Sequence, residues 1–523
     1  MNKMKNAVRT VSNIFFIIFF SKILGQVREM MIANSYGTGM EASAFMTATQ
    51  IPLNFFDIIL GAAIVSAFVP VFNEYYNKGG MALANRFTNN FVGIIALVSL
   101  VISALGVIFS ASIVGILAKG FDAETAHLTS RLLKILFPAM LFTAVAYAYA
   151  GVLQSLGEFK APAAMSIVSN GITILYLLIF KNKFGIFGLA FSMLLGWIMQ
   201  LVLLIPYLVR FKFRFGLNLN FKDPGMKKVY ALAFPILLSS WVQPLNVMFN
   251  TYLASFLNGG QAVSAINYAN KLYLIIASVF TVAVTNLTLP TLSSMFSKGL
   301  EEEAGDVIGN ALKATTLFIL PVMALFILFA KPIVEIVYQS GEFNELSVHL
   351  TSSALMLYSV GMAGYAWQEV LNKSFYALQK SKIPMQTAFL TIGVNIVLSL
   401  CLFKILGIGG LALSAALAAT VSGTVLFIRI RKHNAYIKTR EILVVLLKAA
   451  VSAFISGGAA YALYFGFLQG FAAGRLQKLL LVGAVCLAAI VLYFVLLIVF
   501  RCKEIYGLKQ ILKKEEKEEN AVE

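Results

Sequence analysis

The sequence predicts an all-α, polytopic membrane protein with fourteen transmembrane helices. Three observations predict this class. Of the 523 residues, 59% are hydrophobic and only 12% are charged, which no soluble fold requires. Apolar runs close to the length of one bilayer crossing, about 20 residues, recur along the whole chain. The basic residues between these runs also alternate in density from one connecting segment to the next.

The first expected span retains its N-terminal apolar core instead of being cleaved as a signal peptide, because the helical pattern continues through Lys22 and Arg28 without a small-residue cleavage site. The later spans follow from the apolar runs and the polar segments between them. The approximate expected spans are 11–34, 43–72, 91–118, 132–154, 161–180, 184–209, 229–256, 263–296, 307–330, 348–377, 385–403, 408–428, 442–468 and 479–500.

The distribution of Lys and Arg predicts the orientation. With the N-terminus inside, the cytoplasmic segments carry 26 of these residues and the external loops carry eight. This positive-inside bias predicts a multi-pass protein of the plasma membrane with both termini in the cytoplasm. The net charge of +18 is therefore attributed to topology, and no nucleic-acid partner is expected.

An internal repeat predicts the domain organisation. The motif that begins at Gly185 returns 222 residues later at Gly407, and Pro162 matches Pro384 at the same offset. Six spans separate the copies, so both have the same orientation, and a substrate site is expected between the halves near mid-membrane. The predicted domains are an N-terminal lobe (1–215), a C-terminal lobe (216–430), an added pair of spans (431–505) and a charged cytoplasmic tail (506–523).

Three cations, Lys22, Arg28 and Lys271, lie within these apolar spans. A charged side chain at bilayer depth costs several kcal/mol and usually faces a polar cavity. Because nearby carboxylates do not match them in number, an anionic ligand bound within the membrane is expected. Polar residues also form stripes on single helix faces: Gln50, Asn54 and Asp57; Gln243, Asn246 and Asn250; and Asn267 with Lys271. They are candidates to line the cavity, although any single Asn or Gln can instead make a hydrogen bond between helices.

The acidic residues near these cations have competing interpretations. Glu29 follows Lys22 by seven residues, on nearly the same helix face, and is a candidate counter-ion for it. Asp57 is either a structural partner of the cations or a gate that responds to protons. Glu369 is a candidate cavity or ion site, but its spacing of four from Lys373 favours a local ion pair.

No catalytic constellation is present. The chain has neither a GxxxxGK[ST] motif nor a nucleophile elbow, and its three histidines are scattered. The three cysteines lack a paired spacing, so neither a metal site nor a disulfide framework is expected. The sequence therefore predicts a carrier without enzymatic activity or cofactor, which runs on an ion gradient, the membrane potential or substrate supply.

Several segments resemble one transporter family. They are Ser21-Lys-Ile-Leu-Gly-Gln-Val-Arg-Glu29, Tyr36-Gly-Thr-Gly, Ala67-Phe-Val-Pro-Val-Phe72, Gly151-Val-Leu-Gln-Ser-Leu-Gly-Glu-Phe-Lys-Ala-Pro162 and Phe375-Tyr-Ala-Leu-Gln-Lys-Ser-Lys-Ile-Pro384. Together they resemble the MviN/MurJ family, the lipid II flippases of the multidrug/oligosaccharidyl-lipid/polysaccharide exporter superfamily. The resemblance covers the first twelve spans in order. It implies translocation of the undecaprenyl-diphosphate-linked peptidoglycan precursor to the outer leaflet by alternating access, for cell-wall synthesis.

The resemblance also implies roles for particular residues. Cavity arginines of that family are thought to hold the substrate diphosphate, and by position they correspond here to Lys22, Arg28 and Lys271. The match fails in the second span, where Phe56 and Asp57 stand at the place of two arginines. The last two spans resemble the pair that is thought to form a groove for the lipid tail.

Other functions remain open at this point. A flippase for a different undecaprenyl-diphosphate oligosaccharide, of a capsule, teichoic-type polymer or spore, would fit the departure at Asp57. A cation-coupled drug or metabolite antiporter would need a dominant acidic site and twelve spans. A membrane scaffold would have no use for charges within the spans.

Overall fold

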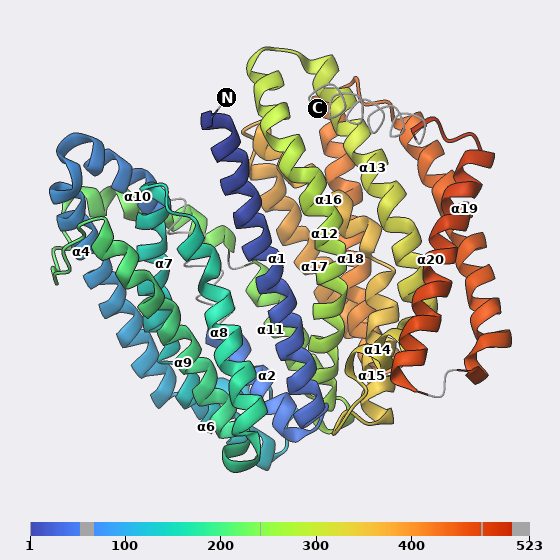
Figure 1. The fold of residues 1–523 in the computed structure, drawn as a ribbon, viewed down its shortest axis with the longest axis horizontal. Helices are drawn as coiled ribbons and strands as arrows, with labels where there is room; N and C mark the ends of the chain where they lie inside the picture. The colour runs from blue at the N-terminus through green and yellow to red at the C-terminus, as the bar shows by residue number, and fades with distance from the viewer. Residues whose placement is uncertain (1, 53–66, 241, 472–473, 505–523) are drawn as a thin grey trace. The chain divides into compact units, whose positions relative to one another are not determined.

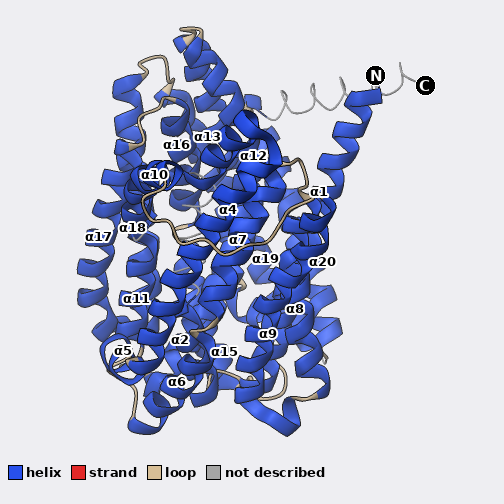
Figure 2. Ribbon diagram, turned by 90° about the vertical axis from the view of Figure 1, so that its left-hand side faces the viewer, coloured by secondary structure: helices blue, strands red, loops and turns tan. Residues whose placement is uncertain are grey.

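The computed structural model describes residues 2–52, 67–240, 242–471 and 474–504, and every regular element in these ranges is helical (Figures 1 and 2). The helices form two compact units. Unit 1 contains Met1–Ser264 together with the short segment Ser340–Asn344, and unit 2 contains Ala265–Gln339 and Glu345–Glu523. The predicted lobe boundaries at 215 and 430 stay predictions.

Unit 1 is built from long helices joined by short turns. In chain order they are α1 (Asn2–Tyr36), α2 (Met40–Pro52), α4 (Val69–Ile108), α5 (Ser110–Leu117), α6 (Ala123–Leu136), α7 (Ala139–Ser155), α8 (Lys160–Ile179), α9 (Lys181–Arg210), α10 (Pro224–Ser240), α11 (Val242–Ala254) and η3 (Asn258–Gly260). Within this unit α1 packs along α8, α8 packs along α9, and α7 packs against both α4 and α9.

Unit 2 has the same kind of architecture with an added pair at the C-terminal end. Its helices are α12 (Gln261–Ser297, which begins in unit 1), α13 (Glu301–Leu328), α14 (Ala330–Tyr338), α15 (Glu345–Ser359), α16 (Met362–Ala377), α17 (Lys382–Leu406), α18 (Ile408–His433), α19 (Thr439–Leu463), η4 (Tyr464–Leu468), η5 (Gln469–Phe471) and α20 (Arg475–Val499). The added helices α19 and α20 pack together, and α19 lies along α13 (Figure 1).

Composition and length confirm the predicted fold class, a polytopic all-α membrane protein. Among the described residues, nine helices are long and apolar enough to cross a membrane, or ten if α15 and α16, which meet at an angle of 51°, form one bent span. The outward faces are apolar: Ile405 is 76% exposed and Phe454 is 81% exposed. Water would penalise such faces, whereas lipid does not. The count of fourteen spans stays a prediction, and the predicted span 43–72 lies partly outside the described residues.

The predicted loop after residue 72 is largely helical in the structure. Helix α4 continues through it and is interrupted only at Gly79 and Gly80, and Gly80 has φ 61° and ψ −159°. A residue with a side chain rarely adopts that backbone conformation, so the glycine permits the chain to change direction there.

Three turns recur at the offset of the internal repeat. Gly185 (φ 54°) and Gly407 (φ 56°), the first residues of the repeated motif, have the same left-handed conformation. The pairs Gly37 and Gly259, and Gly157 and Gln379, are also 222 residues apart and all have positive φ. The turn at Gly157 is closed by a bond from Glu158 N to Leu153 O (2.8 Å), and the equivalent bond from Lys380 N to Phe375 O measures 2.9 Å. The two copies therefore share their connections as well as their sequence motifs.

Each unit has its own hydrophobic core. In unit 1 the core joins α4, α7, α9 and α10 around Phe68, Phe72 and Phe87. In unit 2 one core joins α13, α16 and α18 around Phe375 and Leu426, and two further clusters bind α19 and α20 to α13 and α14. The added pair is thus packed onto unit 2 by apolar contacts along much of its length.

Candidate functional site: a cationic cavity in unit 1

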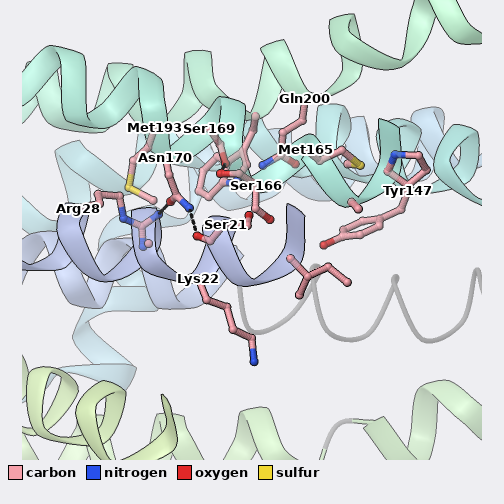
Figure 3. A pocket seen from close by; sticks show the side chains of 15 residues that line it. Ser21, Lys22, Arg28, Tyr147, Met165, Ser166, Ser169, Asn170, Met193 and Gln200 are labelled. Atoms are coloured by element: carbon pink, nitrogen blue, oxygen red, sulfur yellow. Dashed lines mark hydrogen bonds between the residues drawn. The ribbon is translucent and has the colours of Figure 1, made fainter. Parts of the chain in front are cut away.

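A cavity of about 550 Å³ opens between α1, α7, α8 and α9 in unit 1 (Figure 3). Its wall mixes polar and apolar side chains, and both cations predicted on the first span line it. The residues that contribute are Ile18, Ser21, Lys22, Gly25, Arg28, Tyr147, Pro162, Ala163, Met165, Ser166, Ser169, Asn170, Met193, Trp197 and Gln200. The cavity therefore combines positive charge with hydroxyl and amide groups inside an apolar bundle.

Arg28 is the best-positioned cation of this cavity. Its Nη1 donates to Oδ1 of Asn170 on α8 (2.9 Å), and its Nη2 donates to Oε1 of Glu29 (2.5 Å). The Asn170 amide also donates to the backbone oxygen of Ser21 (3.3 Å), which connects α8 to α1 twice. Arg28 retains 22% side-chain exposure and Glu29 only 5%. The guanidinium is thus held at the cavity wall by a buried carboxylate and a buried amide.

The donors of Arg28 are not all used. A guanidinium carries five N–H groups, and the bonds described here engage two of its nitrogens. Its Nε is buried without a hydrogen-bond partner in the described part of the chain, and so is the Ser21 hydroxyl. Unpaired buried donors and acceptors carry a desolvation cost of about 1–3 kcal/mol each. The site is therefore incomplete in its hydrogen bonds.

Lys22 has a different environment from the one predicted. Its side chain is exposed and extends away from Arg28 and Asn170 (Figure 3), and no ion pair of Lys22 occurs within the described ranges. The proposed pairing of Glu29 with Lys22 is wrong, because the buried carboxylate pairs with Arg28 instead. Helix-face spacing placed Glu29 under Lys22, but the long arginine side chain reaches back along α1 once Asn170 fixes its other edge.

The polar stripes of unit 1 are only partly described. Gln50 on α2 accepts a hydrogen bond from the Thr251 hydroxyl on α11 (2.7 Å), so it joins two helices as the alternative interpretation expected. Asn250 is buried, and Asn246 is half-buried. Asn54 and Asp57 lie outside the described residues, as does the side chain of Gln243. Their roles stay predictions.

The polar residues of unit 2 lie on α12 and α16. Asn267 and Lys271 are both half-buried on α12. Glu369 is half-buried on α16, and the expected ion pair with Lys373 does not form. The Lys373 ammonium lies instead over the Tyr376 ring, 6.0 Å from its centroid, so that prediction is wrong. Glu369 has no hydrogen bond or ion pair to any residue that the structure describes, which leaves a carboxylate available within the second unit.

Comparison with known proteins identifies the family. The family described as "Lipid II flippase MurJ" matches residues 32–482, which is most of the chain. This chain belongs to the MurJ lipid II flippase family.

Individual members of the MurJ family resemble the chain over nearly its whole length. The "Lipid II flippase MurJ" of Burkholderia cenocepacia is 27% identical over 514 residues, 96% of this chain and 99% of that protein. A "Probable lipid II flippase MurJ" of Buchnera aphidicola is 28% identical over 426 residues, which cover 81% of this chain and 83% of the relative.

Solved structures agree with this family at the level of fold. A structure titled "Lipid II flippase MurJ, inward closed conformation" matches with a TM-score of 0.80 and 23% identity, and covers 94% of this chain and 99% of that one. An inward-facing multidrug resistance MATE family transporter matches less well, with a TM-score of 0.67 and 15% identity over 80% of this chain and 96% of the other. The MurJ fold is therefore the nearer of these two.

The site of this MurJ family member contains one residue that sequence reasoning missed. Asn170 was not singled out, although it is a single amide in the apolar span predicted at 161–180, the same signal that marked the other polar candidates. Its partner Arg28 was predicted correctly as a cavity cation. Among the described residues, no three His, Cys, Asp or Glu side chains gather as a metal site would require.

Proposed function

We propose that this protein translocates lipid II, the undecaprenyl-diphosphate-linked disaccharide–pentapeptide, from the cytoplasmic to the outer leaflet. Family membership supports a lipid-linked glycolipid as the substrate. The single structural observation that carries the proposal is Arg28, a cation at the wall of a cavity of about 550 Å³ with donors left over. A diphosphate with about two negative charges needs such charge-assisted bonds when it leaves water.

The diphosphate would exchange partners at Arg28. In the structure Glu29 supplies the negative charge that a buried guanidinium requires. An incoming phosphate would compete with Glu29 for the guanidinium edge, while Asn170 keeps the side chain in place. Lys22 and Lys271 would add positive charge, and Gln50, Asn54, Gln243, Asn246, Asn250 and Asn267 would supply polar groups along the path.

The translocation step would use the two repeats as rocking lobes. In this proposal residues 1–215 and 216–430 alternate between openings on the two sides of the membrane, while residues 431–505 hold the long lipid tail in contact with lipid. The charged tail 506–523 and the N-terminus lie in the cytoplasm. Glu369 and Asp57 are candidates for coupling to a cation or to the membrane potential.

Complementation tests the substrate. Cells depleted of their own lipid II flippase should regain growth when this chain is expressed, and they should fail to do so with Arg28→Ala at equal membrane abundance. Arg131→Ala, which removes an exposed arginine that does not line the cavity, is the matched control and should rescue like the unaltered chain.

The opposite outcomes are informative. If the well-expressed chain does not restore growth but restores export of another undecaprenyl-diphosphate oligosaccharide in cells lacking that flippase, lipid II is the wrong substrate. If Arg28→Ala rescues as fully as Arg131→Ala, Arg28 does not hold the diphosphate.

A further inference from the structure

The segment 211–223, here called the strap, connects α9 to α10 in unit 1 and is fixed at both ends. Helix α9 ends through Lys212, whose φ is 59°, and Phe213 N donates to Leu208 O (3.0 Å) in the pattern of a Schellman cap. Helix α10 starts at Pro224, and the Asp223 carboxylate accepts bonds from the next two backbone N–H groups at 2.8 and 3.3 Å. The strap is therefore an ordered part of unit 1.

The strap runs across α4 and α7 (Figure 2) and is bonded to α4 along its length. The Asn90 side chain, 1% exposed, donates to Asn220 O (2.9 Å) and accepts from Asn220 N (2.6 Å), which imitates a backbone pairing. The Asn89 amide donates to Arg214 O (2.8 Å). At Gly93 an added Cβ would lie 2.4 Å from a strap carbonyl, so only glycine allows this approach.

The aromatic residues at the start of the strap root it on α7. The Tyr149 ring meets the rings of Phe213 and Phe215 edge-on, at centroid distances of 5.6 and 5.7 Å. Phe213 is buried, whereas Phe215 remains 48% exposed. The strap is thus held between two helices with one of its faces turned outward.

Three cations gather where the strap passes α4. Arg86, Lys212 and Arg214 line a cavity of about 570 Å³ between the two elements. All three are exposed, and within the ranges that the structure describes none of them forms an ion pair. The neighbouring carboxylates are already engaged: Glu74 binds two lysines at 2.7 Å, and Asp223 caps α10. The cavity therefore carries an unneutralised positive charge.

Exposed apolar side chains border the same cavity. Leu217, a lining residue, is 81% exposed, and Leu219 and Phe221 are 44% and 48% exposed. Beyond the cavity, the outward face of α4 continues with Leu97 and Val101. A soluble anion would need the cations but no apolar border, and a neutral lipid would need the border but no cluster of cations. Phosphate charge joined to hydrocarbon satisfies both.

We propose that the cavity between the strap and α4 binds an anionic phospholipid, with its phosphate at Arg86, Lys212 and Arg214 and its acyl chains along Leu217 and α4. The positive-inside distribution predicts that this site faces the cytoplasmic leaflet, where anionic lipids supply a negative surface. The site lies outside the Arg28 cavity and does not depend on the identity of the transported substrate. It also gives a local role to basic residues that the sequence count attributed to topology.

Lipid titration of the full chain tests the proposal. The delipidated protein in a nonionic detergent is titrated with dioleoylphosphatidylglycerol or dioleoylphosphatidylcholine, and bound lipid is counted by native mass spectrometry. We expect tight binding of the anionic lipid alone. Each cation near a lipid surface is worth about fivefold in affinity, so R86Q/R214Q should bind about 30-fold more weakly. The control K160Q/K227Q removes two exposed lysines of unit 1 that do not line the cavity, and it should bind normally.

A second variant separates lipid from free phosphate. Leu217→Gln changes an 81% exposed side chain, so folding is unaffected, and it should weaken phosphatidylglycerol binding without altering binding of inorganic phosphate. Equal binding by R86Q/R214Q and its control would overturn the proposal. So would phosphatidylcholine binding as tight as that of phosphatidylglycerol. If inorganic phosphate displaces the lipid at millimolar concentration and Leu217→Gln has no effect, the site is a free-phosphate site and the lipid assignment is wrong.

Discussion

Replacing Glu29 by Gln should tighten the binding of lipid II and slow its transport. The structure pairs the Glu29 carboxylate, 4% exposed as a residue, with the guanidinium that is proposed to hold the substrate diphosphate. Each incoming diphosphate must therefore displace this carboxylate from Arg28. Gln keeps the size and the hydrogen-bonding oxygen of the side chain but removes its charge, so the competitor becomes weaker.

The size of the effect follows from the bond that is weakened. A hydrogen bond to a charged group contributes about 1.5–3 kcal/mol, and a neutral one contributes about 0.5–1.5 kcal/mol. The difference, about 1–1.5 kcal/mol, corresponds to a five- to tenfold gain in affinity when a tenfold change equals about 1.4 kcal/mol. Tighter binding without a matching change in the transition state slows release, so turnover should fall while affinity rises.

The assay compares three variants of the full chain in proteoliposomes. Lipid II affinity and the translocation rate are measured for Glu29→Gln, for Arg28→Ala and for Glu124→Gln, which removes an exposed carboxylate of α6 outside the cavity. Arg28→Ala should lose both affinity and rate, and Glu124→Gln should match the unaltered chain. If Glu29→Gln instead loses affinity as Arg28→Ala does, Glu29 positions the arginine and does not compete with the substrate.

Three further changes have defined outcomes. Asn170→Ala removes the 2.9 Å bond that holds Arg28, so the translocation rate should fall about tenfold, a charged hydrogen bond being worth about 1.5–3 kcal/mol, whereas the neighbouring Gly171→Ala, where an added Cβ meets nothing within 4 Å, should leave the rate unchanged. Lys313→Met removes an ammonium that lies 3.3 Å from Glu441, but this carboxylate is 55% exposed and can be hydrated, so unfolding in detergent should shift by less than about 1 kcal/mol; a larger loss would mean that the lysine is essential for holding α19. Arg475→Lys loses the fork that donates to two carbonyls at the end of α14 (2.8 and 2.9 Å), so the thermal midpoint should fall by an amount equivalent to about 1–2 kcal/mol, and an unchanged midpoint would show that the fork is not stabilising.

The sequence was sufficient for the fold class and for the most important cation. Apolar runs and the repeated motif depend on composition and chain order alone, and the matching turns at Gly185 and Gly407 show why the motif recurs: both positions need a left-handed residue between two helices. Arg28 could be predicted because an arginine in an apolar span is costly wherever its partners lie.

Side-chain partners could not be predicted in the same way. Helix spacing assigned Glu29 to Lys22 and Glu369 to Lys373, and both assignments were wrong. Spacing fixes which face of a helix a residue occupies, but the side chain then chooses among rotamers according to groups on other helices. Asn170, which sets the position of Arg28, lies 142 residues along the chain, and no local pattern joins the two.

The repeat separates what scaffolds the protein from what gives unit 1 its charge. Arg28 and Glu29 correspond, 222 residues later, to Asn250 and Thr251, and Asn170 corresponds to Ile392. The turns are preserved across this offset, but the guanidinium, its counter-ion and its amide are not. Thr251 instead donates to Gln50 and joins two helices. Since identical scaffolding carries a charged cluster in one copy and neutral groups in the other, folding alone does not demand the charges at Arg28. Their cost within an apolar bundle is consistent with a ligand that needs them, and the anionic head of a lipid-linked precursor meets that need.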